Sequence, residues 1–230
     1  MAVNKAPADQ AGVEPEIFLA LYEKMLHAYY VEEQCRVFVR AGKCSFYASA
    51  RGHEKVQIAV AMLLQPGKDW FFPYYREKAL MVGLGMPLDQ IFQGMLSRAG
   101  DTNSLGRNMS EHFSSRELNL VSRTSVTAIQ YLNAVGVARA LRAEGEGRVV
   151  HVSSGEGATS EGEFFEALNS ARREKLPVVF LVQNNGYAIS VPQQAQTGSE
   201  VHRMVRRSSQ IPFTRGTGHS RRTWPHFSHQ

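Results

Sequence analysis

Two short apolar runs separated by a helical pattern constrain the fold of this chain more than any other feature. The first run is Arg148 to Ser153, rich in β-branched residues, and the second is Val178 to Val182. Residues 160–163 between them have capping-box spacing and begin a helix that carries Phe164, Phe165, Leu168 and Ala171. A strand, a helix and a second strand with a short return form a βαβ unit, whose strands are parallel. Because parallel sheets are buried on both faces, the unit predicts an α/β fold.

Upstream of this unit the spacing of apolar residues predicts helices. The longest covers residues 14–41, where Gly42 supplies a stop. Further helices are predicted over residues 53–64, from an aromatic segment at 70–76 through Leu84, over 87–96 and over 125–143. Residues 97–123 are rich in Ser, Asn, Gly and Arg and predict an extended loop, and a loop of that length is usually functional or mobile.

The composition is that of a chain that buries a core. Of its 230 residues, 43% are hydrophobic and 10% aromatic, which excludes wholesale disorder. No apolar run approaches the roughly 18 residues of a membrane span, and residues 1–10 lack a signal-type apolar core. The two cysteines, Cys35 and Cys44, form no CxxC pair, so they indicate neither a disulfide framework nor a zinc site. We expect no membrane association and a cytoplasmic location.

The net charge of +5 comes from the end of the chain. Residues 201–230 hold no lysine and no acidic residue, but six arginines: Arg203, Arg206, Arg207, Arg215, Arg221 and Arg222. Without them, twenty basic residues face twenty-one acidic ones. The basic character therefore belongs to the tail, and the body of the chain gives no reason to expect a nucleic-acid partner.

Polar clusters follow both strands of the βαβ unit. Gly155-Glu156-Gly157 follows the first strand and Asn184-Asn185-Gly186-Tyr187 the second, at the strand ends where open α/β sheets bind ligands. A carboxylate, an amide oxygen and backbone carbonyls are hard ligands that suit Mg²⁺. The glycines let the backbone approach a diphosphate, and the following helix N-terminus favours anions. Either cluster alone is more simply an ordinary turn, and Glu156 is expected on a surface turn. GxGxxG and Gly-Lys-Ser/Thr nucleotide motifs are absent.

Together the two clusters resemble the thiamine-diphosphate motif: Gly155-Glu156-Gly157, 26 intervening residues and then Asn184-Asn185, with Glu in place of the more frequent Asp. The string from residue 155 to 192 is similar to the alpha subunit of the decarboxylating component of 2-oxo-acid dehydrogenase complexes. Three further segments resemble that family in the same order: residues 21–42, residues 71–77 and residues 109–112. The resemblance covers roughly residues 15–198 and implies a thiamine-diphosphate-binding fold, a doubly wound parallel sheet with N-terminal helices.

The resemblance also implies roles for individual residues. Glu156, Asn185 and the carbonyl of Tyr187 would bind the Mg²⁺ that bridges the diphosphate. The other cofactor-binding residues would be Tyr75, Arg76, Ser125, Thr127, Gly155, Gly157 and Asn184, and His112 would be catalytic, near the reacting carbon. Without the family, Tyr75 is equally a core residue, His112 a surface loop residue and Ser125 a helix N-cap. Gln183 stands where branched-chain relatives often carry Arg.

The implied activity is oxidative decarboxylation of a 2-oxo acid with reductive acylation of a lipoyl group on an acyltransferase partner. In this family a glutamate of the beta subunit activates the aminopyrimidine, so a beta chain (α2β2) or a fused continuation is expected as partner. Residues 44–47 and 155–158 look more like branched-chain than pyruvate relatives. A hydrophobic pocket discriminates one methylene by only ~1–3 kcal/mol, which leaves both substrate classes open.

The resemblance predicts three regions: a flexible N-terminus at 1–14, a partial thiamine-diphosphate-binding domain at 15–199 and an anomalous basic tail at 200–230. A frameshift or truncation, a natural basic tail and a divergent ending of the domain are the alternatives for the tail. In the first case the sheet is incomplete at the C-terminus, and we expect a chain that is inactive alone. The alternative function is a non-catalytic fragment whose tail binds phosphate-rich partners or nucleic acid through salt-dependent contacts.

Overall fold

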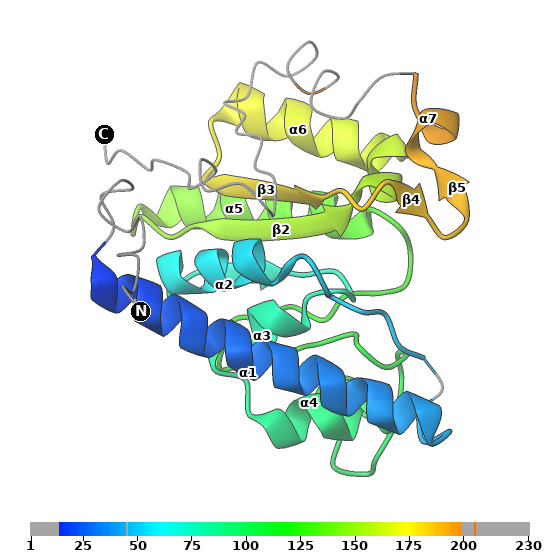
Figure 1. Cartoon of the computed structure of the whole chain (residues 1–230). Coiled ribbons are helices and arrows are strands. Elements are labelled where there is room, and N and C mark those ends of the chain that lie inside the picture. The colour runs from blue at the N-terminus through cyan, green and yellow to red at the C-terminus, as the bar shows by residue number, and fades with distance from the viewer. Residues whose placement is uncertain (1–13, 45, 199–204, 206–230) are drawn as a thin grey trace, which may run out of the picture.

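The computed structural model describes residues 14–44, 46–198 and 205 (Figure 1). Its α-helices are α1 (Pro15–Arg40), α2 (Glu54–Leu63), α3 (Lys78–Leu84), α4 (Leu88–Met95), α5 (Ile129–Glu144), α6 (Gly162–Glu174) and α7 (Gln193–Gln196), and η2 (Glu156–Ser160) is a 3-10 helix. Its strands are β1 (Trp70–Phe72), β2 (Val150–Gly155), β3 (Val178–Gln183), β4 (Tyr187–Ala188) and β5 (Val191–Pro192). The helices predicted over 14–41, 53–64 and 87–96 and both predicted strands are confirmed, with ends that differ by one or two residues.

The described part of the sheet is parallel, as the βαβ pattern predicted. Strands β1, β2 and β3 lie side by side in that order. Val150 of β2 pairs with Trp70 on one side and with Val178 on the other. Strands β4 and β5 form a separate antiparallel hairpin beyond the carboxyl end of β3. All three parallel strands therefore end at the same edge of the sheet.

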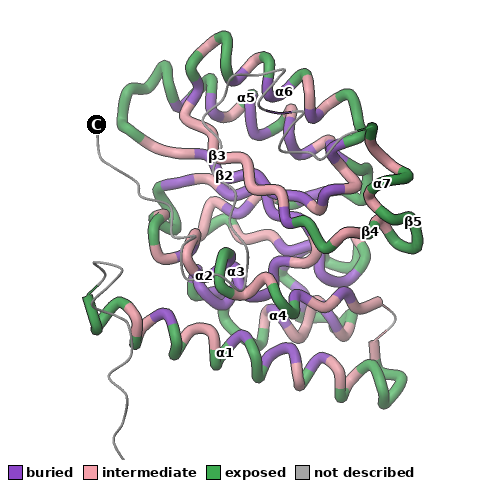
Figure 2. The backbone as a smooth tube through the Cα atoms, turned by 45° about the horizontal axis from the view of Figure 1, so that its top comes forward, coloured by how far each residue is buried: buried purple, intermediate pink, exposed green. Residues whose placement is uncertain are grey.

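Helices lie on both faces of the sheet, which confirms the α/β class. Figures 1 and 2 show α6 on one side and α2 on the other. Val150 and Val152 of β2 pack with α5 and α6 residues such as Tyr131 and Phe164. Phe71 of β1 packs instead with residues of α1 to α4. Each fully buried aromatic or aliphatic side chain in these clusters contributes about 1.5–3 kcal/mol by leaving water.

The aromatic segment at 70–76 begins with a strand that the sequence pattern did not predict. Trp70–Phe72 forms β1, and Phe71 exchanges backbone hydrogen bonds with the predicted loop: its N–H donates to the Asn119 carbonyl at 3.0 Å, and its carbonyl accepts from Val121 N–H at 2.9 Å. Residues 97–123 hold no named helix or strand, so the predicted loop is confirmed. Part of it nevertheless lies along the sheet edge and is buried, for example at Leu120.

One predicted helix start and one predicted helix cap are wrong. The helix predicted over 125–143 begins only at Ile129, because Ala128 adopts a left-handed conformation (φ 68°) that interrupts the turn. The capping box predicted at residues 160–163 does not form, since Glu161 is the N-cap of α6 and its side chain makes no capping bond. Residues 125–128 are consequently free to turn toward the loop at 97–123.

The described helices include none that is long and apolar enough to span a membrane. The six arginines of the tail lie outside the described residues, as does the predicted flexible N-terminus up to residue 13. Val205 is described and is buried within the cluster around α5 and α6. The division at residues 14 and 199 stays a prediction.

Candidate functional site

The candidate site lies where β1, β2 and β3 end, and the fold joins the two polar clusters there. The backbone N–H of Asn185 donates to Oε2 of Glu156 at 3.2 Å, across the ends of β3 and β2. The register pairs Gly155 with Gln183, the last residues of the two strands. The parallel pairing of β2 and β3 therefore brings together residues that are 29 positions apart.

The sequence predicted that Glu156 lies on a surface turn, and this prediction is wrong. The residue is buried, with only 2% of its surface exposed. Its Oε1 atom is buried and has no hydrogen-bond partner among the described residues. An unpartnered buried carboxylate oxygen is costly, unless another group binds it. Glu156 is the first residue of the 3-10 helix η2, which follows β2 directly, and it is one of the two buried residues of that helix.

The Asn184-Asn185 turn is held by its own side chains. Oδ1 of Asn184 accepts the N–H of Gly186 at 2.8 Å, and Oδ1 of Asn185 accepts the N–H of Tyr187 at 2.9 Å. Nδ2 of Asn184 donates to Oε1 of Gln193 at 3.0 Å. Asn184, Asn185 and Tyr187 are exposed, and the backbone N–H of Asn185 bonds this turn to Glu156.

The glycines that flank Glu156 differ in what they permit. A Cβ on Gly157 would lie 2.7 Å from Cβ of Ala188 in β4, closer than real carbon contacts allow. A Cβ on Gly155 would meet Cε2 of Tyr74 at 3.8 Å, an ordinary contact. Gly157 is therefore required for the β4–β5 hairpin to pack on η2, whereas Gly155 is not required sterically.

Tyr75 and Arg76 lie on the segment that follows β1, beside a third residue that the sequence interpretation missed. The guanidinium carbons of Arg76 and Arg123 lie 5.4 Å and 5.3 Å from the centre of the Tyr75 ring. Nη1 of Arg76 donates to the carbonyl of Ser49 at 2.9 Å. Nη1 of Arg123 is buried without a partner among the described residues, and burial lowers the pKa of its guanidinium. Two cations therefore lie beside Tyr75, and Arg123 has a buried donor that bonds no described residue.

The side chains of His112 and Ser125 are in contact, and neither residue lies in a named helix or strand. Nε2 of His112 lies 2.9 Å from Oγ of Ser125, and Nδ1 lies 3.3 Å from the carbonyl oxygen of Ser110. A carbonyl only accepts, so Nδ1 carries the proton and Nε2 of the neutral ring accepts from Ser125. Burial, with a smaller contribution from Arg123, lowers the pKa of His112. Thr127 is exposed two residues beyond Ser125, and Ser125 is not a helix N-cap.

A buried network underlies these residues. Nε2 of Gln183 donates to Oε1 of Glu77 at 2.6 Å, and Oγ of Ser153 donates to Oε2 at 2.5 Å. Burial raises the pKa of Glu77 to about 8. Gln57 donates to Gln183 at 2.8 Å and to the Arg76 carbonyl at 2.9 Å. Gln183 thus supports the site from within, with both polar atoms of its side chain bonded in this network.

Three site residues were not predicted: Tyr74, Glu77 and Arg123. Tyr74 is buried and its ring centre lies 5.3 Å from that of Tyr75. For Tyr74 and Glu77 the only signal in the sequence was that they flank the Tyr75-Arg76 pair. Arg123 ends the predicted loop and carries no motif. Its position follows from the pairing of that loop with β1.

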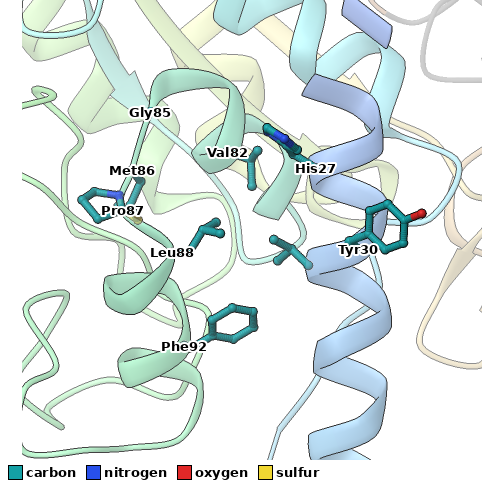
Figure 3. A pocket seen from close by; sticks show the side chains of 9 residues that line it. His27, Tyr30, Val82, Gly85, Met86, Pro87, Leu88 and Phe92 are labelled. Atoms are coloured by element: carbon teal, nitrogen blue, oxygen red, sulfur yellow. The ribbon is translucent and has the colours of Figure 1, made fainter. Parts of the chain in front are cut away.

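A cavity of about 420 Å³ lies elsewhere, between α1 and α4 (Figure 3). It is lined by His27, Tyr30, Val31, Val82, Gly85, Met86, Pro87, Leu88 and Phe92. Apart from His27 and Tyr30 this lining is apolar, and it includes no residue of the candidate site. Within the part of the chain that the structure describes, no three His, Cys, Asp or Glu side chains gather as they would in an all-side-chain metal site.

Comparison with known proteins gives relatives along most of the chain. The alpha subunit of 2-oxoisovalerate dehydrogenase from Bacillus subtilis is 34% identical over 87% of this chain and 60% of its own length. The mitochondrial subunit alpha 2 of the same enzyme from Arabidopsis thaliana is 35% identical over 82% and 39%. The pyruvate dehydrogenase E1 component subunit alpha of Staphylococcus aureus is 32% identical over 80% and 47%. The chain thus spans about 60% or less of the length of these relatives.

A solved structure of a proposed thiamin diphosphate-dependent enzyme from Mycobacterium smegmatis aligns with 66% of this chain, at 19% identity and a TM-score of 0.42. That similarity is low, so the fold assignment rests on the elements described above. The family model for the dehydrogenase E1 component matches residues 22–218, which extends past residue 198, where the recognised resemblance ended. With this match over most of its length, the chain belongs to the dehydrogenase E1 component family.

Proposed function

We propose that this chain binds thiamine diphosphate with Mg²⁺ and forms the alpha part of a 2-oxo-acid dehydrogenase, an oxidoreductase that decarboxylates a 2-oxo acid and reductively acylates a lipoyl group. The observation that carries the proposal is Oε1 of Glu156, which is buried beside the Asn185 turn and has no hydrogen-bond partner in the described part of the chain. It lies at the carboxyl edge of a parallel sheet, where such folds bind ligands.

The residues present fit a magnesium site. Glu156 would supply Oε1, Asn185 its side-chain oxygen and Tyr187 its backbone carbonyl. These are the oxygen ligands that Mg²⁺ prefers, and it usually keeps further positions for water and phosphate. One carboxylate with two neutral ligands leaves charge on the ion for a diphosphate.

The diphosphate would lie between this metal site and the cations beside Tyr75. Arg76 and Arg123 offer planar donor groups that pair well with phosphate oxygens. The unpartnered Nη1 of Arg123 supports adding this residue to the predicted set. Gly155, Gly157 and Asn184 would border the diphosphate through their backbone and the turn they form.

His112, Ser125 and Thr127 would lie near the reacting end. Thiamine diphosphate supplies the carbanion-stabilising chemistry of decarboxylation. The chain's own contribution would be a neutral His112, whose Nε2 accepts the hydrogen bond of the Ser125 hydroxyl at 2.9 Å. A lowered pKa keeps Nε2 unprotonated near pH 7, as a general base requires.

The partners would be a beta subunit, in an α2β2 assembly or as a fused continuation, and a lipoylated acyltransferase. The beta subunit would provide the glutamate that activates the aminopyrimidine. The substrate would be a branched-chain 2-oxo acid or pyruvate, since relatives named for both chemistries are 32–35% identical. We place the assembly in the cytoplasm.

Calorimetry with thiamine diphosphate, with and without Mg²⁺, on the chain assembled with a beta subunit tests the proposal. We expect wild-type binding that EDTA removes, and loss of Mg²⁺-dependent binding in Glu156→Gln, which keeps volume and removes charge. Glu161→Gln is the matched control, because Glu161 is exposed on the same turn. Absence of metal-dependent binding in the wild type, or unchanged affinity in Glu156→Gln, contradicts the proposed site. Salt-dependent binding to nucleic acid in its place would favour the fragment alternative.

A further inference from the structure

Lys78, Glu32 and Glu111 meet in a buried group that we name the Lys78 cluster. All three side chains are 1% exposed. Nζ of Lys78 lies 2.5 Å from Oε1 of Glu111 and 3.3 Å from Oε1 of Glu32. It also donates to the carbonyl of Ala48 at 2.6 Å. The cluster lies outside the residues assigned above to the metal, the diphosphate and the proton transfer.

Two carboxylates around one ammonium are an expensive arrangement away from water. Buried ion pairs recover their desolvation cost only with good geometry and full hydrogen bonding. Both carboxylates meet this condition. Glu32 accepts from the N–H of Ala50 at 2.9 Å and from the hydroxyl of Tyr47 at 2.5 Å, and Glu111 accepts from the N–H of Ala48 at 2.7 Å. Because both carboxylates are hydrogen-bonded in this way, we infer that the cluster fixes the positions of the segments that carry them.

The cluster connects three segments that are distant in sequence. Glu32 lies in α1, Lys78 begins α3 two residues after Arg76, and Glu111 directly precedes His112. The bond from Ala48 to Glu111 spans 63 positions, and the ion pair with Lys78 spans 33. The loop that carries His112 is therefore tied to the segment that carries Arg76.

Glu111 also has a strained backbone. Its φ is +67°, a left-handed conformation that residues with long side chains rarely adopt. Two bonds from its carboxylate hold it there, to Lys78 and to Ala48. In the residue before Glu111, Oγ of Ser110 donates to the carbonyl of Phe46 at 3.1 Å. The direction in which the chain leaves Glu111 sets where the ring of His112 lies.

We propose that Glu111 is a positioning residue: its ion pair with Lys78 holds the left-handed turn that places Nε2 of His112 against Ser125. This inference rests on the proposed function for the role of His112, but the placement itself can be measured without cofactor or partner. Removing the ion pair releases the turn, and His112 then leaves its buried position while the sheet remains folded.

Chemical modification of histidines measures this release in the full chain. Diethyl pyrocarbonate reacts with accessible imidazoles, and peptide mass spectrometry after digestion gives the rate at each histidine. His112 is 5% exposed and reports the loop, whereas His151 is 0% exposed in the central strand β2 and reports global unfolding. The ratio of the two rates separates a local movement from a loss of stability.

Two variants each remove one carboxylate charge next to Lys78. Glu111→Gln leaves Lys78 paired with Glu32, so no net charge stays uncompensated in the cluster. Glu32→Gln is the matched control, with equal burial: its carboxylate ties α1 to residues 47–50 and to Lys78, whereas the carboxylate of Glu111 belongs to the His112 loop itself. We expect Glu111→Gln to raise the His112 rate about tenfold or more at an unchanged His151 rate, a shift of ~1.4 kcal/mol in the local opening. Glu32→Gln leaves the ratio unchanged.

The proposal is overturned if the His112 rate does not change in Glu111→Gln, or if it rises only in proportion to the His151 rate. An equal effect of Glu32→Gln on the ratio also overturns it. Calorimetry with thiamine diphosphate and Mg²⁺ is a separate measurement. Failure of the wild type to bind the cofactor rejects the proposed function and leaves the positioning result as it stands.

Discussion

The hydroxyl of Ser125 lies 2.9 Å from Nε2 of His112, across 13 positions of irregular chain. The contact exists because Ala128 adopts a left-handed conformation, which delays the start of α5 and lets residues 125–127 turn toward the loop. A helix that began at Ser125 would have directed that hydroxyl to its own backbone. An irregular segment therefore forms a part of the candidate site that a regular helix would have removed.

His112 should titrate below 6.5, the ordinary value for histidine. Burial lowers its pKa and the charge of Arg123 lowers it further, so Arg123→Met should raise the midpoint toward 6.5. Arg116→Met is the control, because Arg116 is an exposed arginine of the same loop. NMR titration of the His112 ring measures both. A midpoint at or above 6.5 in the wild type, or no rise in Arg123→Met, contradicts the described environment.

Gly157→Ala should destabilise the chain and displace the β4–β5 hairpin. Its new Cβ would lie 2.7 Å from Cβ of Ala188, and overpacking of this kind typically costs about 1–3 kcal/mol. Because Tyr187 precedes Ala188 in β4, Mg²⁺-dependent affinity for thiamine diphosphate should also fall. Gly155→Ala is the matched control, with its nearest contact at 3.8 Å. Denaturant unfolding and calorimetry that showed equal effects of both substitutions would reject this packing.

Glu77 should make the chain less stable as the pH rises. Burial raises its pKa in the folded state to about 8 from 4.5, so the folded chain holds a proton that the unfolded chain releases. This contribution is fully present below pH 4.5 and is lost as the pH rises through 8, at most about 5 kcal/mol. Glu77→Gln imitates the protonated form and should remove this slope. Denaturant unfolding between pH 5 and 9 measures it, and parallel curves for both proteins would show that Glu77 is ionised when folded.

His151 should have the opposite effect. Both of its ring nitrogens are buried without a partner among the described residues, and burial lowers its pKa to about 4. Its contribution is therefore present above pH 6.5 and is lost as the pH falls toward 4, by about 3 kcal/mol. His151→Leu should flatten the unfolding free energy over that interval and raise it overall, since two unpartnered polar atoms disappear. An acid slope that persisted unchanged in His151→Leu would assign the effect to other groups.

Local patterns in the sequence predicted most of the described elements. The periodicity of α1, α2 and α4 and the β-branched runs of β2 and β3 depend on residues close together in the chain, so they could be read from it. The short strand β1 could not, because three residues show no period and its pairing with Val150 and Leu120 is formed by distant segments. The start of α5 was predicted too early for a similar reason. Ser125, which precedes the helix, contacts His112, a residue of a distant segment.

The sequence by itself determined the parallel βαβ unit, its two polar ends and, through the motif, which residues to examine there. Only the tertiary structure decided that Glu156 is buried with one oxygen unbonded to any described residue, that Arg123 lies beside Tyr75, and that Gln183 turns inward to Glu77. It also decided that Lys78 and Glu111 pair behind His112. A motif specifies residue types and spacing along the chain, whereas burial and pairing depend on which distant segments pack together.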